Sequence, residues 1–569
     1  MHTTTSAGAS SAATATVTRS GRPRGGDRST AWQPAWLIGA VSLWIASAGN
    51  LALWFALHRL QLLAGWRGAG FAAGLGLGIA ALLSLLLALL NWRRTLKPVL
   101  TLLLLAAAFG AHFMLSYGVV IDSTMVVNVL QTHVREALDL FSPRLLVTVL
   151  LIGVLPAAVV WRTPLAWGSR PRQLRNNLLL LLAAGALLAA ALVSVYQPLS
   201  ATSRNHRQLR YLVNPLNALV AAGQVAAQPL RRTGSQALLA LGEDARLRAA
   251  AAQAKPPLLL LVLGETARSD HFALNGYARP TTPELAALGV TSQRNAWSCG
   301  TSTAASVPCM FSHLGREAYG SRQQDHETLV DVLQRAGLAV LWLDNQAGCK
   351  GVCERVPTVN TSALRHAGLC ADGECLDEIL LDGLDARIAT LPAERRARGV
   401  VLVMHQMGSH GPAYPKRSPA AFKRFQPECH SAELQDCSRD EVVNAYDNSI
   451  AYTDHFLAAA IRWLQGRAAS ADTALLYVSD HGESLGENNL YLHGLPYALA
   501  PDAQKHVPWI SWFSPGFAQR SGATDACLQQ RLDEHVSHDQ YFHSVLGLLD
   551  VHTRAYRPDW DFYRPCRQP

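Results

Sequence analysis

Acidic residues are almost absent from the first third of this 569-residue chain. Between Trp36 and about Gln197 the sequence consists largely of Leu and Ala runs, whereas beyond about Lys255 it has the mixed composition of an ordinary soluble domain. The chain is also too long for one compact core, so at least two domains are expected. The shortage of acidic residues therefore marks a first domain whose composition is unlike that of a soluble fold.

Cysteine is missing from the same part of the chain, since all ten cysteines lie at or after Cys299. Close pairs of cysteines can hold zinc as thiolates, but an even number confined to one part of the chain favours disulfides in an oxidising compartment. The sequence does not prove the connectivity. Pairing neighbours along the chain gives Cys299–Cys309, Cys349–Cys353, Cys370–Cys375, Cys429–Cys437 and Cys527–Cys566.

Residues 1–30 lack the short apolar core of a cleaved signal peptide. They are rich in Ser, Thr, Ala, Gly and Arg, a composition that predicts a disordered cytoplasmic tail. The apolar run that follows is therefore expected to act as an uncleaved membrane anchor.

The first part of the chain contains about five apolar runs, each near the ~20 residues that cross a bilayer. One such run could be a buried helix of a soluble protein, but five in series with basic flanks indicate a membrane domain, which we place at residues 31–197. The runs are Trp36–Leu57, Gly70–Leu90, Val99–Val120, Leu145–Trp161 and Leu178–Tyr196.

The placement of Arg and Lys predicts the orientation of these spans. The N-terminus is expected in the cytoplasm, and an odd number of spans puts residues 256–569 on the outer side. Basic residues concentrate before the first span, after the second and after the fourth, at Arg19, Arg22, Arg24, Arg28, Arg93, Arg94, Lys97, Arg162, Arg170, Arg172 and Arg175.

The net charge of +9 requires no nucleic-acid partner, because much of it comes from the tail and the cytoplasmic loops. The remainder suits an anionic membrane surface. Residues 198–255 are expected to bridge the two domains. Their basic, amphipathic content suits the membrane interface, with a plain linker as the alternative; the basic residues are Arg204, Arg207, Arg210, Arg231 and Arg232.

In the second part of the chain, four short apolar runs each end in a polar residue. Continuous apolar runs between helical stretches predict a mainly parallel sheet covered on both faces, and ligand sites of such sheets lie beyond the carboxyl ends of the strands. One such polar residue could simply cap a helix. Four together predict a site, formed by Glu265, Asn345, His405 and the pair Asp480-His481.

Two carboxylates and an imidazole, from Glu265, Asp480 and His481, form a ligand set that suits Zn²⁺. A threonine hydroxyl could complete a tetrahedron, and coordination would lower the pKa of that hydroxyl. Candidates lie between Cys299 and Cys309, where small residues surround Thr301, Ser302 and Thr303. A loop closed by these cysteines would be rigid, as a covalent catalyst requires; a stapled surface turn is the alternative.

With Gly264-Glu265-Thr266, the Cys299–Cys309 segment and Ser479-Asp480-His481-Gly482-Glu483, the chain resembles the lipid A phosphoethanolamine transferases. These include the mobile colistin-resistance enzymes and belong to the alkaline-phosphatase/sulfatase-like superfamily. The resemblance implies a five-span α-helical transmembrane domain followed by an α/β domain with a mainly parallel central sheet. It places the protein in the bacterial inner membrane with residues 256–569 in the periplasm.

The resemblance also implies the reaction. Phosphoethanolamine would pass from phosphatidylethanolamine to a lipid A phosphate, which would lower the negative charge of the outer membrane and the sensitivity to polymyxin. The partners are then these two lipids and the inner membrane, with no nucleic acid, and the protein is expected to be a monomer. The cofactor is one catalytic Zn²⁺, with a second metal during turnover as an option.

Family motifs assign roles to individual residues. Thr303 would be the nucleophile and, with Glu265, Asp480 and His481, a zinc ligand. His410 and His493 would contact the phosphoryl group, directly or through a second metal. Lys350 matches a basic residue near the phosphoethanolamine, and His405 matches another histidine that lines the site.

On the membrane side, Asn128, Thr132 and Glu136 match positions that hold the lipid headgroup. Their i, i+4, i+8 spacing would place all three on one helix face; a helix solvated at the membrane surface is the alternative. Two residues depart from the family pattern: His133, where an acid is more usual, and Gln346, where some members carry Asn or Ser near the headgroup.

These assignments predict a ping-pong mechanism. Thr303 would displace diacylglycerol to give a phosphoethanolamine-threonine, which a lipid A phosphate would then attack. A histidine, His405 or His410, would protonate the leaving alkoxide.

Other functions are compatible with the same motifs. The acceptor could be a core heptose or a periplasmic glycan, or the chain could be a phosphodiesterase or phosphoglycerol transferase of the same superfamily. A sulfatase would need a Cys or Ser nucleophile in a Pro/Arg motif, in which Thr303 does not lie. A catalytically dead scaffold would lack a ligand or the nucleophile, and none is missing.

Overall fold

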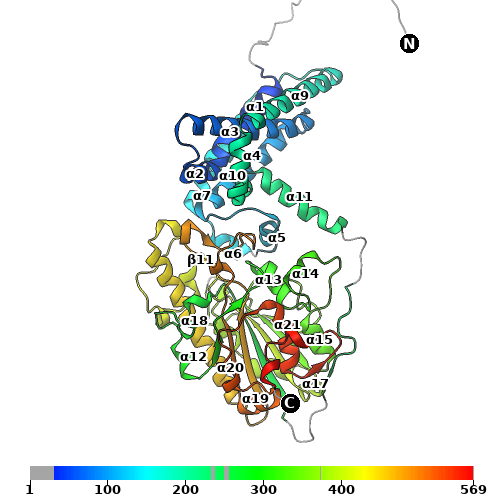
Figure 1. The fold of residues 1–569 in the computed structure, drawn as a ribbon, viewed down its shortest axis with the longest axis vertical. Helices are drawn as coiled ribbons and strands as arrows, with labels where there is room; N and C mark the ends of the chain where they lie inside the picture. The colour runs from blue at the N-terminus through cyan, green and yellow to red at the C-terminus, as the bar shows by residue number, and fades with distance from the viewer. Residues whose placement is uncertain (1–30, 133, 232–237, 249–254, 372, 568–569) are drawn as a thin grey trace, which may run out of the picture.

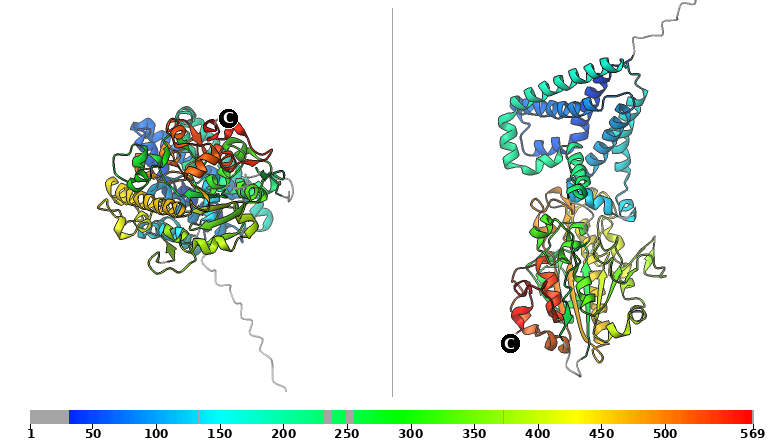
Figure 2. Two further views of the ribbon diagram at one scale, coloured as in Figure 1. Left: turned by 90° about the horizontal axis from the view of Figure 1, so that it is seen from below. Right: turned by 90° about the vertical axis from the view of Figure 1, so that its right-hand side faces the viewer.

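A computed structural model describes residues 31–132, 134–231, 238–248, 255–371 and 373–567. The tail at residues 1–30, His133 and Arg232 lie outside the described residues. The chain forms two bodies, a helical domain and an α/β domain, joined end to end (Figures 1 and 2). The predicted architecture, five apolar helices followed by a sulfatase-like α/β domain, is confirmed.

The helical domain contains, among the described residues, five helical segments long and apolar enough to cross a membrane. The fifth begins eight residues before the predicted run, because polar residues such as Gln173 and Asn177 pack inside the domain. The segments are α1 (Pro34–Ser47) with η1 (Ala48–Asn50) and α2 (Leu51–Arg59); α3 (Gly65–Leu89); α4 (Leu96–Ser116); α7 (Pro143–Thr148) with η2 (Val149–Val154) and α8 (Leu155–Arg162); and α9 (Arg170–Ser194).

Helices α3 and α9 pack along one another, and a small residue permits their close approach. A Cβ atom at Gly74 would lie 2.4 Å from Cγ1 of Val195. Membrane helices associate through such small residues, because lipid tails supply no hydrophobic force between helices.

The bridging segment consists of α10 (Tyr196–Asn205), η3 (Arg207–Leu212) and α11 (Leu216–Arg231). The chain then reaches the α/β domain, where the short strand β1 (Arg246–Leu247) pairs antiparallel with β15 (Val551–His552). The described part of this segment is therefore largely helical.

A seven-stranded sheet in the order β3-β13-β10-β2-β9-β5-β6 forms the centre of the α/β domain. The five strands from β10 to β6 are parallel. At one end β13 is antiparallel to β10, and β3 is antiparallel to β13, so β3 runs in the same direction as the five. The strands are β2 (Pro257–Gly264), β3 (Thr291–Gln293), β5 (Ala339–Asp344), β6 (Thr358–Asn360), β9 (Val400–His405), β10 (Asp472–Ser479) and β13 (Trp509–Phe513).

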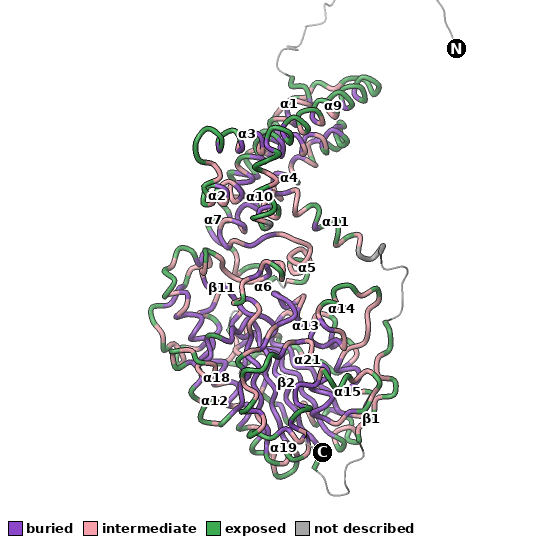
Figure 3. The backbone as a smooth tube through the Cα atoms, viewed as in Figure 1, coloured by how far each residue is buried: buried purple, intermediate pink, exposed green. Residues whose placement is uncertain are grey.

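Helices cover both faces of this sheet, so its central strands are buried along their length (Figure 3). On one face Leu259 and Leu261 of β2 pack in a core with α13 (Thr303–Met310), α15 (Leu329–Arg335) and α21 (His538–Leu548). On the other face Leu258 and Leu260 pack in a core with α18 (Arg439–Gln465). Burial on both faces explains why the strands are continuous apolar runs rather than alternating ones.

All ten cysteines of the α/β domain form disulfides. Four of the five close short loops, and the fifth joins α20 (Asp525–Gln529) to the C-terminal residues. The pairs are Cys299–Cys309, Cys349–Cys353, Cys370–Cys375, Cys429–Cys437 and Cys527–Cys566.

Residues 117–142, which we name the strap, connect α4 to α7 and lie between the two domains (Figure 1). The strap contains α5 (Ser123–Gln131) and α6 (Val134–Asp139). The prediction that Asn128, Thr132 and Glu136 share one helix is wrong, because Thr132 is extended and ends α5. Its hydroxyl donates a hydrogen bond to the carbonyl of Asn128 at 2.8 Å, a local bond that competes with helix continuation.

Glu433, in the loop closed by Cys429 and Cys437, anchors the α/β domain to the helical domain. Its buried carboxylate accepts a hydrogen bond from the Ser142 hydroxyl and lies 3.5 Å from both His112 Nε2 and Arg144 Nη1. His112 belongs to α4, and Ser142 caps α7. One carboxylate thus contacts both helices that hold the ends of the strap.

We expect Glu433→Ala to destabilise the interface between the domains by about 2 kcal/mol, because it leaves buried polar groups of α4 and α7 without their acceptor. The thermal unfolding midpoint in detergent should fall. Asp436→Ala is the matched control: this carboxylate pairs with the same Arg144 at 2.8 Å but is 48% exposed, so its loss should change stability by less than about 0.5 kcal/mol. Equal losses in the two variants would contradict the anchor.

Candidate active site

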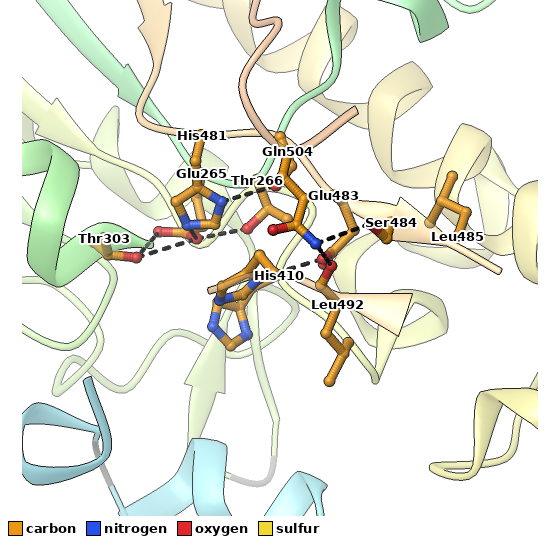
Figure 4. A network of polar contacts seen from close by, with 12 residues as sticks. Glu265, Thr266, Thr303, His410, His481, Glu483, Ser484, Leu485, Leu492 and Gln504 are labelled. Carbon is orange, nitrogen blue, oxygen red and sulfur yellow. Dashed lines mark hydrogen bonds and ion pairs between the residues drawn. The ribbon is translucent and has the colours of Figure 1, made fainter. Parts of the chain in front are cut away.

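Three side chains that could ligate a metal ion meet at the carboxyl ends of β2 and β10. The parallel register pairs Ser479 with Gly264, so Glu265 follows one strand beside Asp480 and His481, which follow its neighbour. One ligand atom from each lies within 4.8 Å of the others, and all three residues are buried. Figure 4 shows His481 directly over Glu265.

The geometry of this cluster fits a metal ion. Asp480 Oδ2 and His481 Nε2 are buried and make no hydrogen bond with the described residues, although His481 Nε2 lies 3.4 and 3.5 Å from oxygens of Glu265 and Asp480. The other polar atoms are held by the backbone: His481 Nδ1 lies 2.9 Å from the carbonyl of Gly482. Such outer contacts fix the orientation of metal ligands.

The pKa values of the three side chains also favour a bound cation. Burial raises the pKa of Asp480 to about 6, helped by the charge of Glu265. Burial alone would lower the pKa of His481, but Asp480 and Glu265 raise it to about 10. Burial would likewise raise the pKa of Glu265, whereas His481 holds it well below its usual range. Two buried carboxylates therefore require a positive partner, which a bound cation would supply.

Thr303 is the hydroxyl that reaches this cluster. It is the first residue of α13, and its Oγ1 donates toward Glu265 Oε2 at 3.1 Å (Figure 4). The Thr301 hydroxyl donates instead to the carbonyl of Leu495 at 2.6 Å, and the buried Ser302 hydroxyl has no hydrogen-bond partner among the described residues. The structure thus separates the three hydroxyls by their surroundings.

A cavity of about 170 Å³ opens onto Thr303 between the strap and the α/β domain. Apolar side chains of α4 and of the strap line one end of it. The lining residues for which the sequence suggested a substrate-binding or catalytic role are Asn128, Thr132, Glu136, Thr303, Gln346, Lys350, His410 and His493. The three strap residues therefore share a cavity even though they do not share a helix.

The polar atoms of this cavity differ in how far they are already paired. Gln346 donates from Nε2 to Glu265 Oε2 at 3.2 Å, beside the metal-ligand cluster. Lys350 Nζ donates to the carbonyl of Gln131 in the strap at 3.3 Å. Glu136 is buried, and its Oε1 has no hydrogen-bond partner among the described residues. An unpaired buried carboxylate suits a cationic ligand.

His410 and His493 lie side by side at the cavity, with ring centres 5.5 Å apart. The ring centre of His493 lies 4.3 Å from that of His481, and its Nδ1 lies 3.3 Å from Glu483 Oε1. Burial lowers the pKa of His493 to about 3, and the charge of His481 adds to this effect. Burial also raises the pKa of Glu483 to about 8.

His405 and Asn345 occupy different surroundings from His410. His405 is fully buried and is absent from the cavity lining; its Nδ1 lies 3.1 Å from Asp344 Oδ2. Burial alone would lower the pKa of His405, but Asp344 raises it. Asn345 lies at the predicted edge, since its backbone N–H donates to the carbonyl of His405 at 2.9 Å. Its side chain does not line the cavity and donates instead to Asp377 at 2.8 Å and to the carbonyl of Cys375 at 2.9 Å.

Sequence reasoning also missed residues that shape the site. Gly408 has a positive φ of 53°, and a Cβ atom there would lie 2.7 Å from the carbonyl oxygen of Glu265. Only glycine fits this close approach without strain. Glu483 belongs to a motif that was recognised, but the motif did not indicate its contact with His493. Arg417 of the α/β domain pairs with Asp139 of the strap at 3.0 Å, and no motif in the sequence indicated this contact.

Solved structures and curated proteins similar to this chain cover most of its length. The integral membrane protein lipooligosaccharide phosphoethanolamine transferase A from Neisseria meningitidis has 34% identity and a TM-score of 0.88, over 94% of this chain and 99% of that one. Phosphoethanolamine transferase EptA of Salmonella typhimurium is 41% identical over 82% of this chain and 84% of its own length. Phosphatidylethanolamine transferase Mcr-1 of Escherichia coli is 36% identical over 91% and 95%.

Two family models match the chain. The sulfatase model matches residues 257–551, so the parallel sheet with its metal-ligand cluster defines a sulfatase-like domain. The model for phosphoethanolamine transferase EptA/EptB matches residues 79–230. Together with the relatives, these matches show that the chain belongs to the lipid A phosphoethanolamine transferase family.

We expect the Asp480→Ala and His481→Ala variants to lose bound metal, because each removes one ligand from a three-residue cluster and metal affinity depends on the full set. Elemental analysis of the purified full-length protein measures this. His455→Ala is the control, since His455 lies on α18 and pairs with Glu284 at 2.8 Å. Wild-type metal content in either cluster variant would contradict the ligand set.

Proposed function

We propose that this protein transfers phosphoethanolamine from phosphatidylethanolamine to a phosphate of lipid A through a covalent intermediate on Thr303. The observation that carries the proposal is the position of the Thr303 hydroxyl. It lies against the Glu265–Asp480–His481 cluster and faces a cavity whose other wall is the strap of the membrane domain. Both substrates are lipids, so a nucleophile at the junction with the membrane domain suits them.

The cofactor of the proposed reaction is Zn²⁺, held by Glu265, Asp480, His481 and Thr303. When bound, it would supply a Lewis acid that lowers the pKa of the Thr303 hydroxyl and neutralises phosphate charge. The donor set of carboxylates, imidazole and hydroxyl is of the kind that zinc prefers.

Thr303 performs the bond exchange. Its Oγ forms a bond to the phosphorus of phosphatidylethanolamine while the bond from phosphorus to the glycerol oxygen breaks, and diacylglycerol leaves. A lipid A phosphate oxygen then attacks the same phosphorus and releases Thr303. Glu265, whose Oε2 lies 3.1 Å from Thr303 Oγ1, orients the hydroxyl for the first step.

His410 is the better candidate to protonate the leaving glycerol oxygen. It lines the cavity that contains Thr303, whereas His405 is fully buried and held by Asp344. A general acid must reach the atom that it protonates, so access to the cavity decides between the two histidines.

The cavity also provides complementary groups for the headgroup. Glu136 offers a buried carboxylate to the ethanolamine ammonium, with Asn128 and Thr132 beside it in the lining. Lys350 and His493, on the α/β side, suit the phosphate. Apolar lining residues such as Phe113 and Leu140 suit the start of an acyl chain.

Lipid A is the acceptor that the relatives favour. The solved structure with a TM-score of 0.88 is named a lipooligosaccharide phosphoethanolamine transferase. The Kdo(2)-lipid A phosphoethanolamine 7''-transferase of Escherichia coli is 24% identical. The proposed location is the inner membrane, with the disulfide-containing domain in the periplasm, where disulfides persist.

Intact-mass analysis tests the nucleophile. After incubation with phosphatidylethanolamine, the wild type should gain the mass of one phosphoethanolamine group, and Thr303→Ala should gain none, because it has no oxygen to carry the group. Thr301→Ser keeps the hydroxyl that bonds Leu495 and should form the adduct like the wild type. An adduct on Thr303→Ala would refute the assignment of Thr303.

Mass spectrometry of lipid A tests the acceptor. Cells that express the wild type should contain lipid A with added phosphoethanolamine and should survive higher polymyxin concentrations, since the modification reduces the negative charge that attracts a cationic peptide. Cells that express Thr303→Ala should show neither change. Unmodified lipid A, combined with adduct formation on the purified protein, would point to another acceptor.

A further inference from the structure

Helix α6 of the strap faces the α/β domain at two neighbouring positions of one helix face. Glu136 lines the cavity beside Thr303, and Asp139 lies one turn further along the same helix. The Asp139 carboxylate pairs with two cations of η7 (Tyr414–Arg417): Lys416 Nζ at 2.5 Å and Arg417 Nη2 at 3.0 Å. The helix that carries Glu136 is therefore tied directly to η7.

The two cations differ in burial and in what else they touch. Lys416 is 56% exposed, and its ammonium pairs with Asp139 alone among the described residues. The Arg417 side chain is only 2% exposed and divides its donors among three acceptors. Besides Asp139, Nη1 donates to Glu374 Oε2 at 2.8 Å, and Nε donates to the backbone carbonyl of His410 at 3.0 Å.

The position of Arg417 is fixed by these contacts. A buried guanidinium is costly unless charged partners compensate it, and its planar fork makes bonds in set directions. A shift of Asp139 therefore moves the whole guanidinium, including the Nε–H that holds the His410 carbonyl. Lys416 has no such link.

We propose that Arg417, held by Asp139, is a positioning residue that places His410 according to how the strap is seated. The inference rests on the proposed function, in which His410 protonates the leaving glycerol oxygen. A headgroup bound between Glu136 and Thr303 draws α6 onto the α/β domain, and the Asp139–Arg417 pair transmits that position to the turn that carries His410.

The identity of the leaving group provides the test. The alkoxide of diacylglycerol is a poor leaving group, so its oxygen needs a proton as its bond to phosphorus breaks. A nitrophenyl ester of phosphoethanolamine releases a stabilised nitrophenolate, which needs none. A variant with a misplaced general acid should therefore fail with the lipid donor and succeed with the nitrophenyl donor.

The experiment measures the first step with both donors, on the full-length protein in detergent micelles. Asp139→Asn and Arg417→Lys keep the size or the charge of the original residue but break the link to His410. With phosphatidylethanolamine, both should form diacylglycerol at least about tenfold more slowly than the wild type. With the nitrophenyl donor, both should release nitrophenol within about threefold of the wild-type rate.

Lys416→Gln is the matched control, because it removes the exposed partner of the same carboxylate. It should keep both rates. His410→Gln should lose rate with the lipid donor only, as the two test variants do. Equal losses with both donors in Asp139→Asn and Arg417→Lys would indicate a purely structural role and overturn the inference, as would a lipid-specific loss in Lys416→Gln.

Failure of the proposed function gives a different pattern. Thr303→Ala should abolish turnover of both donors; turnover in that variant would refute the nucleophile. If His410→Gln kept the full rate with the lipid donor, the general acid would be another group. The positioning role assigned to Arg417 would then also be refuted.

Discussion

The pairing of β2 with β10 is the constraint on which the site depends. These two parallel strands lie side by side in register, so the residues that follow them, Glu265 on one and Asp480 and His481 on the other, must share a small buried volume. Two carboxylates buried this way are unfavourable without positive charge, so the fold creates a demand that a protonated His481 or a bound cation would meet. The loop with Thr303 and the turn with Gly408 then pack against Glu265.

The second half of the site comes from the membrane domain. Both ends of the strap are fixed to the α/β domain: Tyr117 donates from its hydroxyl to the carbonyl of Ala432 at 3.1 Å, and Ser142 donates to the neighbouring Glu433. Between these ends, α5 and α6 contribute side chains to the lining of the cavity that contains Thr303. This cavity is therefore a property of the complete chain rather than of either domain.

The sequence predicts the fold well where one physical effect dominates. The five apolar spans and the strands such as Leu258–Leu263 were recognisable, because helices in lipid and strands buried on both faces need continuous apolar residues. The same strand-end argument correctly located Glu265 beside Asp480 and Asn345 beside His405, but it did not indicate that the Asn345 side chain turns toward Asp377. Contacts such as Arg417 with Asp139 join residues 278 positions apart, and no local pattern encodes them.

The division of the cavity between two domains has a consequence for inhibitor discovery. A truncated α/β domain would retain the metal-ligand cluster and Thr303 but lack Asn128, Thr132 and Glu136, which line the opposite wall. Compounds selected against such a fragment would recognise mainly the Glu265–Asp480–His481 cluster and the groups around it, on the sulfatase-like part of the chain. Selective compounds would instead need to span the junction and engage Glu136, so screening should use the full-length protein.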